Sequence, residues 1–250
     1  MKVVIPELKN SIVEESIKSF PSIEFFSAKD INFAAKLVAE NQADSMISGL
    51  DYSSRDVLLA YKNNIPLASP FFSSCFICKK GDKFLTIADG GVNKLPTKEQ
   101  LYTIIEDTAK THEKYFGTTP IIALLSYSTK GSGGKNPDLE KYHFCLDQIH
   151  RNHPDWLIDG EMQLDAAINP TVATKKIPNS PVAGRANILI TPDLNSGNIL
   201  YKSLEHLGGW TIAGPIIQGF IRPLADLSRG SSIEDTILTI DVIKKLHERK

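Results

Sequence analysis

The opening segment of the chain, residues 3–48, reads VVIPELKNSIVEESIKSFPSIEFFSAKDINFAAKLVAENQADSMIS. Short apolar runs typical of buried strands alternate in it with helical patterns, and they lie at 3–5, 23–26 and 45–48. Asn10 and Asp30 stand where helix N-caps are expected, and a third helix is expected from about Ser54. This strand–helix alternation predicts an α/β fold whose sheet is mainly parallel and whose crossovers are right-handed.

Composition and charge exclude several classes of protein. The 250 residues carry a net charge of −1 with no long basic run, which argues against nucleic acid as a partner. No apolar run approaches a membrane span, and Pro6 and Glu7 interrupt the N-terminal segment too early for a signal peptide. The three cysteines form no disulfide framework, so we expect a cytoplasmic protein.

Pro66 and Pro70 punctuate the chain after the third helix and indicate a domain boundary. Beyond them, Thr97 and Gln100 form a capping-box pattern at the start of a helix. The elements expected in this part are a hairpin of 71–78 and 83–88, helices at 97–116, 139–152 and 198–207, and strands at 121–126, 156–158 and 186–191.

The last helix begins within Ser228-Arg229-Gly230-Ser231-Ser232-Ile233-Glu234-Asp235. Its apolar face is predicted from the spacing of Ile233, Ile237, Ile240, Ile243 and Leu246. Ser232 and Asp235 have the spacing of an N-cap and a carboxylate in the first turn. The pattern alone leaves two interpretations open: a simple helix cap, or an anion-binding active site that contains its own base.

Several segments, in the same order along the chain, resemble the phosphate acetyltransferase/phosphate butyryltransferase family. The most specific is 226–235, DLSRGSSIED, which resembles the signature segment of that family. The other segments are 88–93, 125–132, 159–167, 181–187, 192–198 and 214–219. Together they cover roughly residues 44 to 240, and it is their number and order that make the resemblance specific.

The resemblance implies two α/β lobes with mainly parallel sheets and an active-site cleft between them, as in isocitrate/isopropylmalate dehydrogenase-like architectures. We expect residues 1–69 with 217–250 to form the first domain and residues 70–216 to form the second. Ser228 would then lie in the cleft. Members of the family are commonly homodimers, so a homodimer is expected.

The resemblance also implies the reaction acyl-CoA + phosphate ⇌ acyl phosphate + CoA, by direct attack within a ternary complex. Asp235 would accept the proton of the CoA thiol, Arg229 would hold carbonyl or phosphoryl oxygens, and Ser228 would hydrogen-bond the thiol or the developing charge. CoA and its thioester are substrates here, and no permanently bound cofactor or metal is expected. In agreement, no Gly-x-Gly-x-x-Gly segment follows a strand, so a nicotinamide cofactor has no support.

Further residues are predicted to bind substrate. The turn formed by Ser128, Thr129, Lys130 and Gly131 follows a buried strand and is either an anion-binding nest or an ordinary turn; the resemblance favours the nest. The remaining candidates are Ser53, Ser54, Asn195 and Asn198.

Two pairs of residues invite a simpler interpretation. Cys75 and Cys78 have zinc-site spacing, but they fall within a strand and are expected to pack in the core. Asp89 and Asp193 stand at strand ends, where turn formation is the default.

The sequence also departs from the family pattern. Leu59 stands where the family usually has an arginine associated with CoA binding, and Gly90 replaces a cysteine common in the acetyl type. Acetyl is favoured as the acyl group by residues 228–232, whereas 198–204 resemble the butyryl type. The alternative is a non-catalytic protein on the same scaffold, one that binds CoA or acyl phosphate or has a structural role.

Overall fold

A computed structural model describes residues 1–134 and 138–249. The chain divides into two compact units: unit 1 contains residues 1–72 and 210–250, and unit 2 contains residues 73–209. The boundaries expected from the sequence are 69/70 and 216/217. The second boundary falls seven residues earlier than expected (216 − 209) because β9 (Thr211–Gln218) belongs entirely to unit 1.

Unit 1 is an α/β unit whose sheet has the strand order β2-β1-β3-β10-β9. Its elements are β1 (Lys2–Val4), α1 (Ser11–Ile17), β2 (Glu24–Phe26), α2 (Ile31–Ala39), β3 (Ser45–Ser48), α3 (Ser54–Asn64), β9, β10 (Leu224–Asp226) and α9 (Ile233–Glu248). All pairs are parallel except β10 with β9, which confirms the mainly parallel sheet predicted from the opening segment. Every residue of the central strand β3 is buried.

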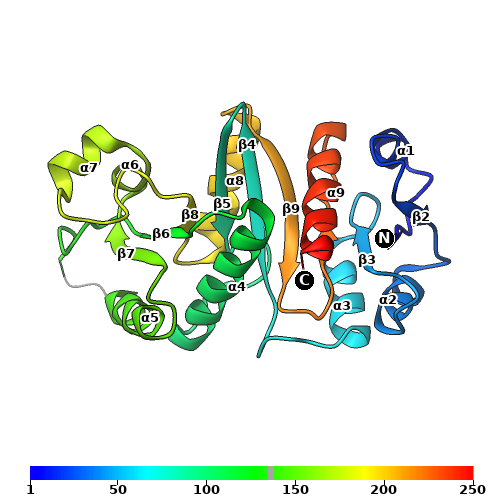
Figure 1. Cartoon of the computed structure of the whole chain (residues 1–250), viewed down its shortest axis with the longest axis horizontal. Coiled ribbons are helices and arrows are strands. Elements are labelled where there is room, and N and C mark those ends of the chain that lie inside the picture. Colours follow the sequence, from blue (N-terminus) through cyan, green and yellow to red (C-terminus); the bar gives the residue numbers. More distant parts are fainter. Residues whose placement is uncertain (135–137, 250) are drawn as a thin grey trace. The chain divides into compact units, whose positions relative to one another are not determined.

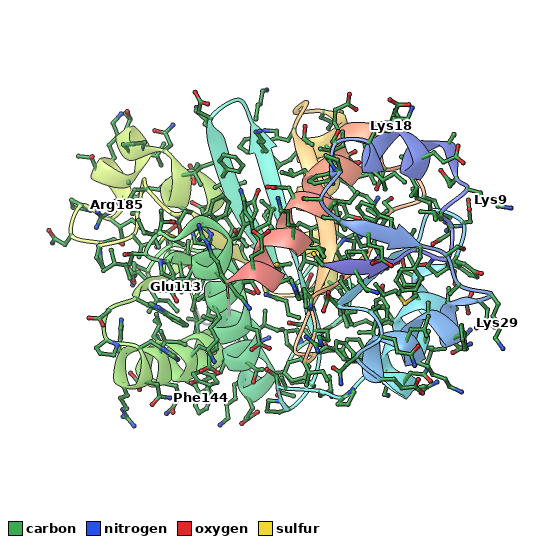
Figure 2. All side chains as sticks on the ribbon, turned by 45° about the vertical axis from the view of Figure 1, so that its right-hand side comes forward. Lys9, Lys18, Lys29, Glu113, Phe144 and Arg185 are labelled. Atoms are coloured by element: carbon green, nitrogen blue, oxygen red, sulfur yellow. The ribbon has the colours of Figure 1, made fainter. Side chains whose placement is uncertain are left out.

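The helices of unit 1 form two packed pairs, α1 with α9 and α2 with α3 (Figure 1). Asn10, Asp30 and Ser53 accept hydrogen bonds from backbone N–H groups in the first turns of α1, α2 and α3, so these helices begin where their capping residues predict. Charged side chains such as Lys9, Lys18 and Lys29 point away from the strands (Figure 2).

Unit 2 has the strand order β4-β5-β8-β6-β7. Its elements are β4 (Ser73–Lys80), β5 (Lys83–Ala88), α4 (Lys98–Phe116), β6 (Ile121–Leu125), α5 (Asp138–Asn152), β7 (Leu157–Met162), α6 (Leu164–Ile168), α7 (Pro170–Lys176), β8 (Ile188–Ile190) and α8 (Leu194–His206). The predicted hairpin is confirmed as the antiparallel pair β4 and β5, and the other pairs are parallel. Both α4 and α8 pack against β4 and β5.

The helix α8 begins earlier than predicted. Its predicted start is Asn198, but the carboxylate of Asp193 accepts the backbone N–H of Ser196 at 2.8 Å and caps a helix that begins at Leu194. The predicted capping box at the start of α4 is confirmed, because Thr97 and Gln100 exchange both hydrogen bonds. The short helices α6 and α7 and the strands β9 and β10 were not predicted.

No helix in the described part of the chain is long and apolar enough to cross a membrane.

Candidate active site

Ser228 lies two residues beyond the carboxyl end of β10, which pairs in parallel with β3. The N–H of Leu227 still donates to the carbonyl of Ser48 at 2.6 Å, after which the chain turns toward α9. In that turn the N–H of Ser231 donates to the Ser228 carbonyl at 2.9 Å, and the N–H of Gly230 lies 3.3 Å from the Ser228 hydroxyl oxygen. Ligands of α/β proteins collect at such carboxyl ends, so the fold of unit 1 places Ser228 at a suitable edge.

Arg229 is exposed in this turn, and the described residues offer its guanidinium no hydrogen-bond or ion-pair partner. It lies three residues before Ser232, the N-cap of α9. A free guanidinium beside a helix N-terminus is well suited to bind an anion such as phosphate.

Asp235 is buried, with an exposed fraction of 6%, and both of its carboxylate oxygens accept hydrogen bonds. Oδ2 accepts the Ser232 N–H at 2.9 Å and the Ser232 hydroxyl at 2.7 Å. Oδ1 accepts the N–H of Ile212 in β9 at 2.7 Å. The predicted helix cap is therefore confirmed, and the carboxylate also ties α9 to the neighbouring strand.

The turn at 128–131 has its donors occupied by a carboxylate of the same unit. Glu161 Oε1 accepts the Gly131 N–H at 2.7 Å and the Ser128 hydroxyl at 2.9 Å. Burial acts to raise the pKa of Glu161, but these hydrogen bonds outweigh it and leave the pKa below its usual value. The turn thus binds an anion, as a nest does, but in this structure the anion is a side chain.

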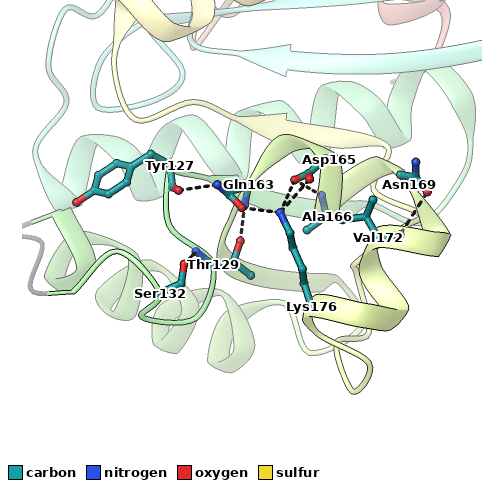
Figure 3. A network of polar contacts seen from close by, with 9 residues as sticks. All are labelled: Tyr127, Thr129, Ser132, Gln163, Asp165, Ala166, Asn169, Val172 and Lys176. Atoms are coloured by element: carbon teal, nitrogen blue, oxygen red, sulfur yellow. Dashed lines mark hydrogen bonds and ion pairs between the residues drawn. The ribbon is translucent and has the colours of Figure 1, made fainter.

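Thr129 and Lys130 are also engaged within unit 2. Lys130 forms an ion pair with Asp159 and donates to the Gly160 carbonyl at 2.8 Å. Figure 3 shows the Thr129 hydroxyl accepting the Gln163 N–H at 3.0 Å, while the Gln163 side chain donates to the Tyr127 carbonyl. Lys176 of α7 completes this network by donating to Gln163 Oε1 at 2.6 Å and pairing with Asp165.

The four remaining candidates lie in or near the first turns of two helices. Ser53 caps α3, and its hydroxyl donates to Asp56 at 2.7 Å. Ser54 lies near the carboxyl group of Asp226, and therefore near the segment that contains Ser228. In unit 2, Asn195 is exposed on α8, and the Asn198 amide donates to the Gly90 carbonyl at 3.3 Å.

Sequence reasoning missed two buried acids of unit 1, Glu7 and Asp226. Their exposed fractions are 7% and 1%, so both lie inside the carboxyl edge of the sheet. Asp226 stands in the signature segment, but its burial could not be inferred there because strand β10 was not predicted. Glu7 carries no local signal, because the residues that it contacts lie some forty positions further along the chain.

The simpler interpretations of Asp89 and the cysteines agree with the structure. Asp89 accepts the N–H groups of Gly91, Val92 and Asn93 at 3.0–3.1 Å and forms a turn. Cys75 and Cys78 are both fully buried in β4, and burial is the main cause that raises the pKa of each thiol.

Comparison with known proteins identifies the family. The family model described as "Phosphate acetyl/butaryl transferase" matches residues 14–243. The chain belongs to this family. The phosphate acetyltransferase of Treponema pallidum is 38% identical over 218 residues, a match that covers 83% of this chain and 65% of the relative. The chain therefore spans just under two thirds of the length of that curated phosphate acetyltransferase.

Solved structures show the same fold. A crystal structure of a phosphotransacetylase from Streptococcus pyogenes superposes with a TM-score of 0.87 at 30% identity and covers 100% of this chain and 94% of that one. A branched-chain phosphotransacylase from Enterococcus faecalis V583 gives a TM-score of 0.83 at 21% identity, with 100% of both chains covered. The second likeness concerns the fold alone.

Proposed function

We propose that this chain of the phosphate acetyl/butyryl transferase family catalyses acyl-CoA + phosphate ⇌ acyl phosphate + CoA. In the direction of acyl-CoA synthesis, the CoA thiolate attacks the carbonyl carbon of the acyl phosphate. The new C–S bond forms, the C–O bond to phosphate breaks, and phosphate leaves with the electron pair. The thiol proton passes to a base of the protein.

The observation that carries this proposal is the exposed Arg229, with no partner among the described residues, beside Ser228 at the carboxyl edge of the unit 1 sheet. Phosphate and a developing oxyanion both need positive charge, and a guanidinium next to a helix N-terminus supplies it without reorganisation. A free thiol has a pKa of about 8.5, so its attack near neutral pH also requires a proton acceptor.

Asp235 is the residue that we propose as this acceptor, with Ser228 as a hydrogen-bond donor to the thiol or to the developing charge. The hydrogen bonds that Asp235 accepts from Ser232 and Ile212 hold its carboxylate in one orientation. The same hydrogen bonds would suffice for a purely structural cap. The two roles are separated by the effect of substitution on rate, as described in the Discussion.

The acyl group is proposed to be acetyl, because residues 228–232 resemble the acetyl type. The butyryl-like segment 198–204 lies in α8, where Ile199 is 66% exposed and Leu200 is half-buried. Acetyl-, propionyl- and butyryl-CoA should therefore be compared with phosphate as the second substrate.

Release of free thiol from these thioesters tests the proposal directly. Phosphate-dependent thiol release, with acetyl-CoA the best substrate, is the expected result. The competing hypothesis is a non-catalytic protein that binds CoA or acyl phosphate on the same scaffold. Binding of CoA by calorimetry without thiol release from any of the three thioesters would favour that hypothesis and overturn the enzyme.

A further inference from the structure

Asp226, the last residue of β10, has an incompletely satisfied carboxyl group. Its side chain is buried, with an exposed fraction of 1%, and its Oδ1 has no hydrogen-bond partner among the described residues. Ser54 of α3 lies near the same carboxyl group and acts to lower its pKa. A buried carboxylate normally accepts hydrogen bonds at both oxygens, because an unsatisfied charged oxygen is costly.

A second buried carboxyl lies next to it. Glu7 Oε1 accepts the Gly49 N–H at 2.8 Å, and Glu7 Oε2 accepts the Ser48 hydroxyl at 2.9 Å. Asp226 contacts the same glycine: a Cβ added to Gly49, whose φ is +121°, would lie 2.5 Å from Asp226 Oδ1. Gly49 therefore lets the two carboxyl groups approach one backbone position that no larger residue could occupy.

Among the described residues, the groups that face Asp226 supply no positive charge. From the loop after β1 comes Glu7, whose negative charge disfavours ionisation of Asp226. From α3 come Ser54 and Tyr61, whose hydroxyl donates to the Ala225 carbonyl at 2.7 Å. Burial, followed by the charges of Asp226 and Glu7, raises the pKa of Tyr61 well above its usual value, so this phenol stays neutral. Neither carboxyl forms an ion pair with a described Lys, Arg or His.

These surroundings favour the neutral form of Asp226. Burial raises its pKa to about 7; the nearby Ser54 side chain opposes this rise, and the charge of Glu7 adds to it. Protonation removes the uncompensated charge of this buried carboxyl group.

We propose that Asp226 is a positioning residue whose neutral carboxyl holds the segment Leu227–Ser232 in place and whose loss of a proton loosens it. The functional part of this proposal rests on the proposed function, because that segment carries Ser228 and Arg229. Ionisation would place two buried carboxylates beside Gly49. A Cβ added to this glycine would also lie 2.3 Å from the Leu227 carbonyl oxygen, so we expect the segment that begins at Leu227 to respond to the added charge.

The effect on stability has a definite sign. In the unfolded chain Asp226 loses its proton near its ordinary value of 3.8, whereas in the folded protein it retains the proton to about pH 7. The folded state therefore binds more protons between these values, and its stability falls as pH rises through this window. Asp226→Asn keeps the shape of the neutral acid, and it should lose this part of the pH dependence.

Hydrogen–deuterium exchange of residues 227–232, corrected for the intrinsic rate, tests the proposal without requiring activity. Between about pH 5 and about pH 8 the wild-type segment should become several-fold less protected, whereas Asp226→Asn should stay constant. Glu234→Gln is the matched control, because this exposed carboxylate lies in the same region, and it should behave as wild type. Equal pH dependence in wild type and Asp226→Asn would overturn the proposal.

Glu7→Gln gives a second test if Asp226→Asn does not fold. Removing the neighbouring negative charge makes ionisation of Asp226 easier, so the loss of protection should move to lower pH. An unchanged or higher midpoint would contradict the proposed coupling.

If the chain shows turnover, kcat should fall over the same pH range in wild type, and Asp226→Asn should lack this fall. Absence of turnover would contradict the proposed function, but the exchange test would still apply. Turnover together with the same pH dependence of exchange in wild type and Asp226→Asn would contradict only the positioning role of Asp226.

Discussion

Asp235 stabilises the first turn of α9, and the same carboxylate is the proton acceptor that we propose. The sequence pattern suggests that Asn would replace it as a cap with little loss. The structure changes that expectation, because Oδ1 and Oδ2 both accept hydrogen bonds from N–H groups. An Asn amide would direct its NH₂ group at one of these donors.

Asp235→Asn is therefore expected to lower both stability and rate, by different mechanisms. The unsatisfied donor should cost about 1–3 kcal/mol of unfolding free energy. If Asp235 takes the thiol proton, turnover near neutral pH should also fall by roughly 10²–10⁴-fold, mainly in kcat. Relative to wild type at the same pH, higher pH should restore part of the rate, because thiolate then forms without a base.

Steady-state thiol kinetics against pH, with urea unfolding of the same samples, separates these effects. Glu234→Gln in the same helical turn should change neither quantity appreciably. A folded Asp235→Asn protein with full activity near neutral pH would reduce Asp235 to a cap.

Arg229 allows a cleaner test, because no interaction with a described residue is lost when it is replaced. Arg229→Gln should weaken phosphate binding by about 10- to 100-fold, the value of one charged hydrogen bond. Arg222→Gln is the matched control, since that arginine instead donates to Asn41 at 2.5 Å. Calorimetric titration with phosphate gives the comparison, and equal affinities of Arg229→Gln and wild type would remove Arg229 from the site.

At the scale of elements, α3 combines a regular capping pattern with one departure from the family. Ser53 caps the helix, and Val57, Ala60 and Tyr61 are buried, so its packing needs no help from Leu59. Leu59 is 43% exposed. The family resemblance places an arginine associated with CoA binding at position 59, so we expect an added positive charge there to strengthen CoA binding.

Leu59→Arg should therefore lower the KM for CoA or acyl-CoA while leaving kcat and stability nearly unchanged. One added charged contact to a phosphate of CoA is worth a few-fold to roughly tenfold in KM. Lys62→Arg, an exposed conservative change on the same helix, is the control. No change in KM for Leu59→Arg would show that residue 59 does not contact CoA in this protein.

At the scale of the whole molecule, unit 1 is discontinuous along the chain, since residues 73–209 separate its two parts. Strand β10 pairs with β3, and Tyr61 of α3 donates to the Ala225 carbonyl, so the early strands and helices depend on the late ones. Unit 2, in contrast, consists of one continuous segment.

A chain ended after residue 209 should therefore leave residues 1–72 unprotected against proteolysis, whereas residues 73–209 keep most of their protection. The physical reason is that β3 loses its β10 neighbour and α1 loses its packing against α9. Mass spectrometry of limited digests, with the full chain as control, checks this. Equal protection of residues 1–72 in both proteins would contradict it.

The sequence alone determined the features that depend on nearby residues. The caps Asn10, Asp30, Thr97 and Ser232 predicted four helix starts, because a cap and its N–H partners lie within three residues. The alternation of apolar runs likewise predicted the parallel strands. The predicted start of α8 was wrong because Asp193 was interpreted only as a turn former, although its carboxylate also caps the helix.

Only the tertiary structure decided which side chains meet across long separations. Glu161 accepts hydrogen bonds from Ser128 and Gly131 in the predicted nest, although it lies thirty or more positions away in the sequence. The hydrogen bond from Ile212 to Asp235 similarly joins β9 to α9. The contact of Asp226 with Gly49, next to Glu7, required the pairing of β3 with β10. Local patterns cannot encode such encounters, because burial and the pKa of a carboxyl group depend on which distant strands lie beside it.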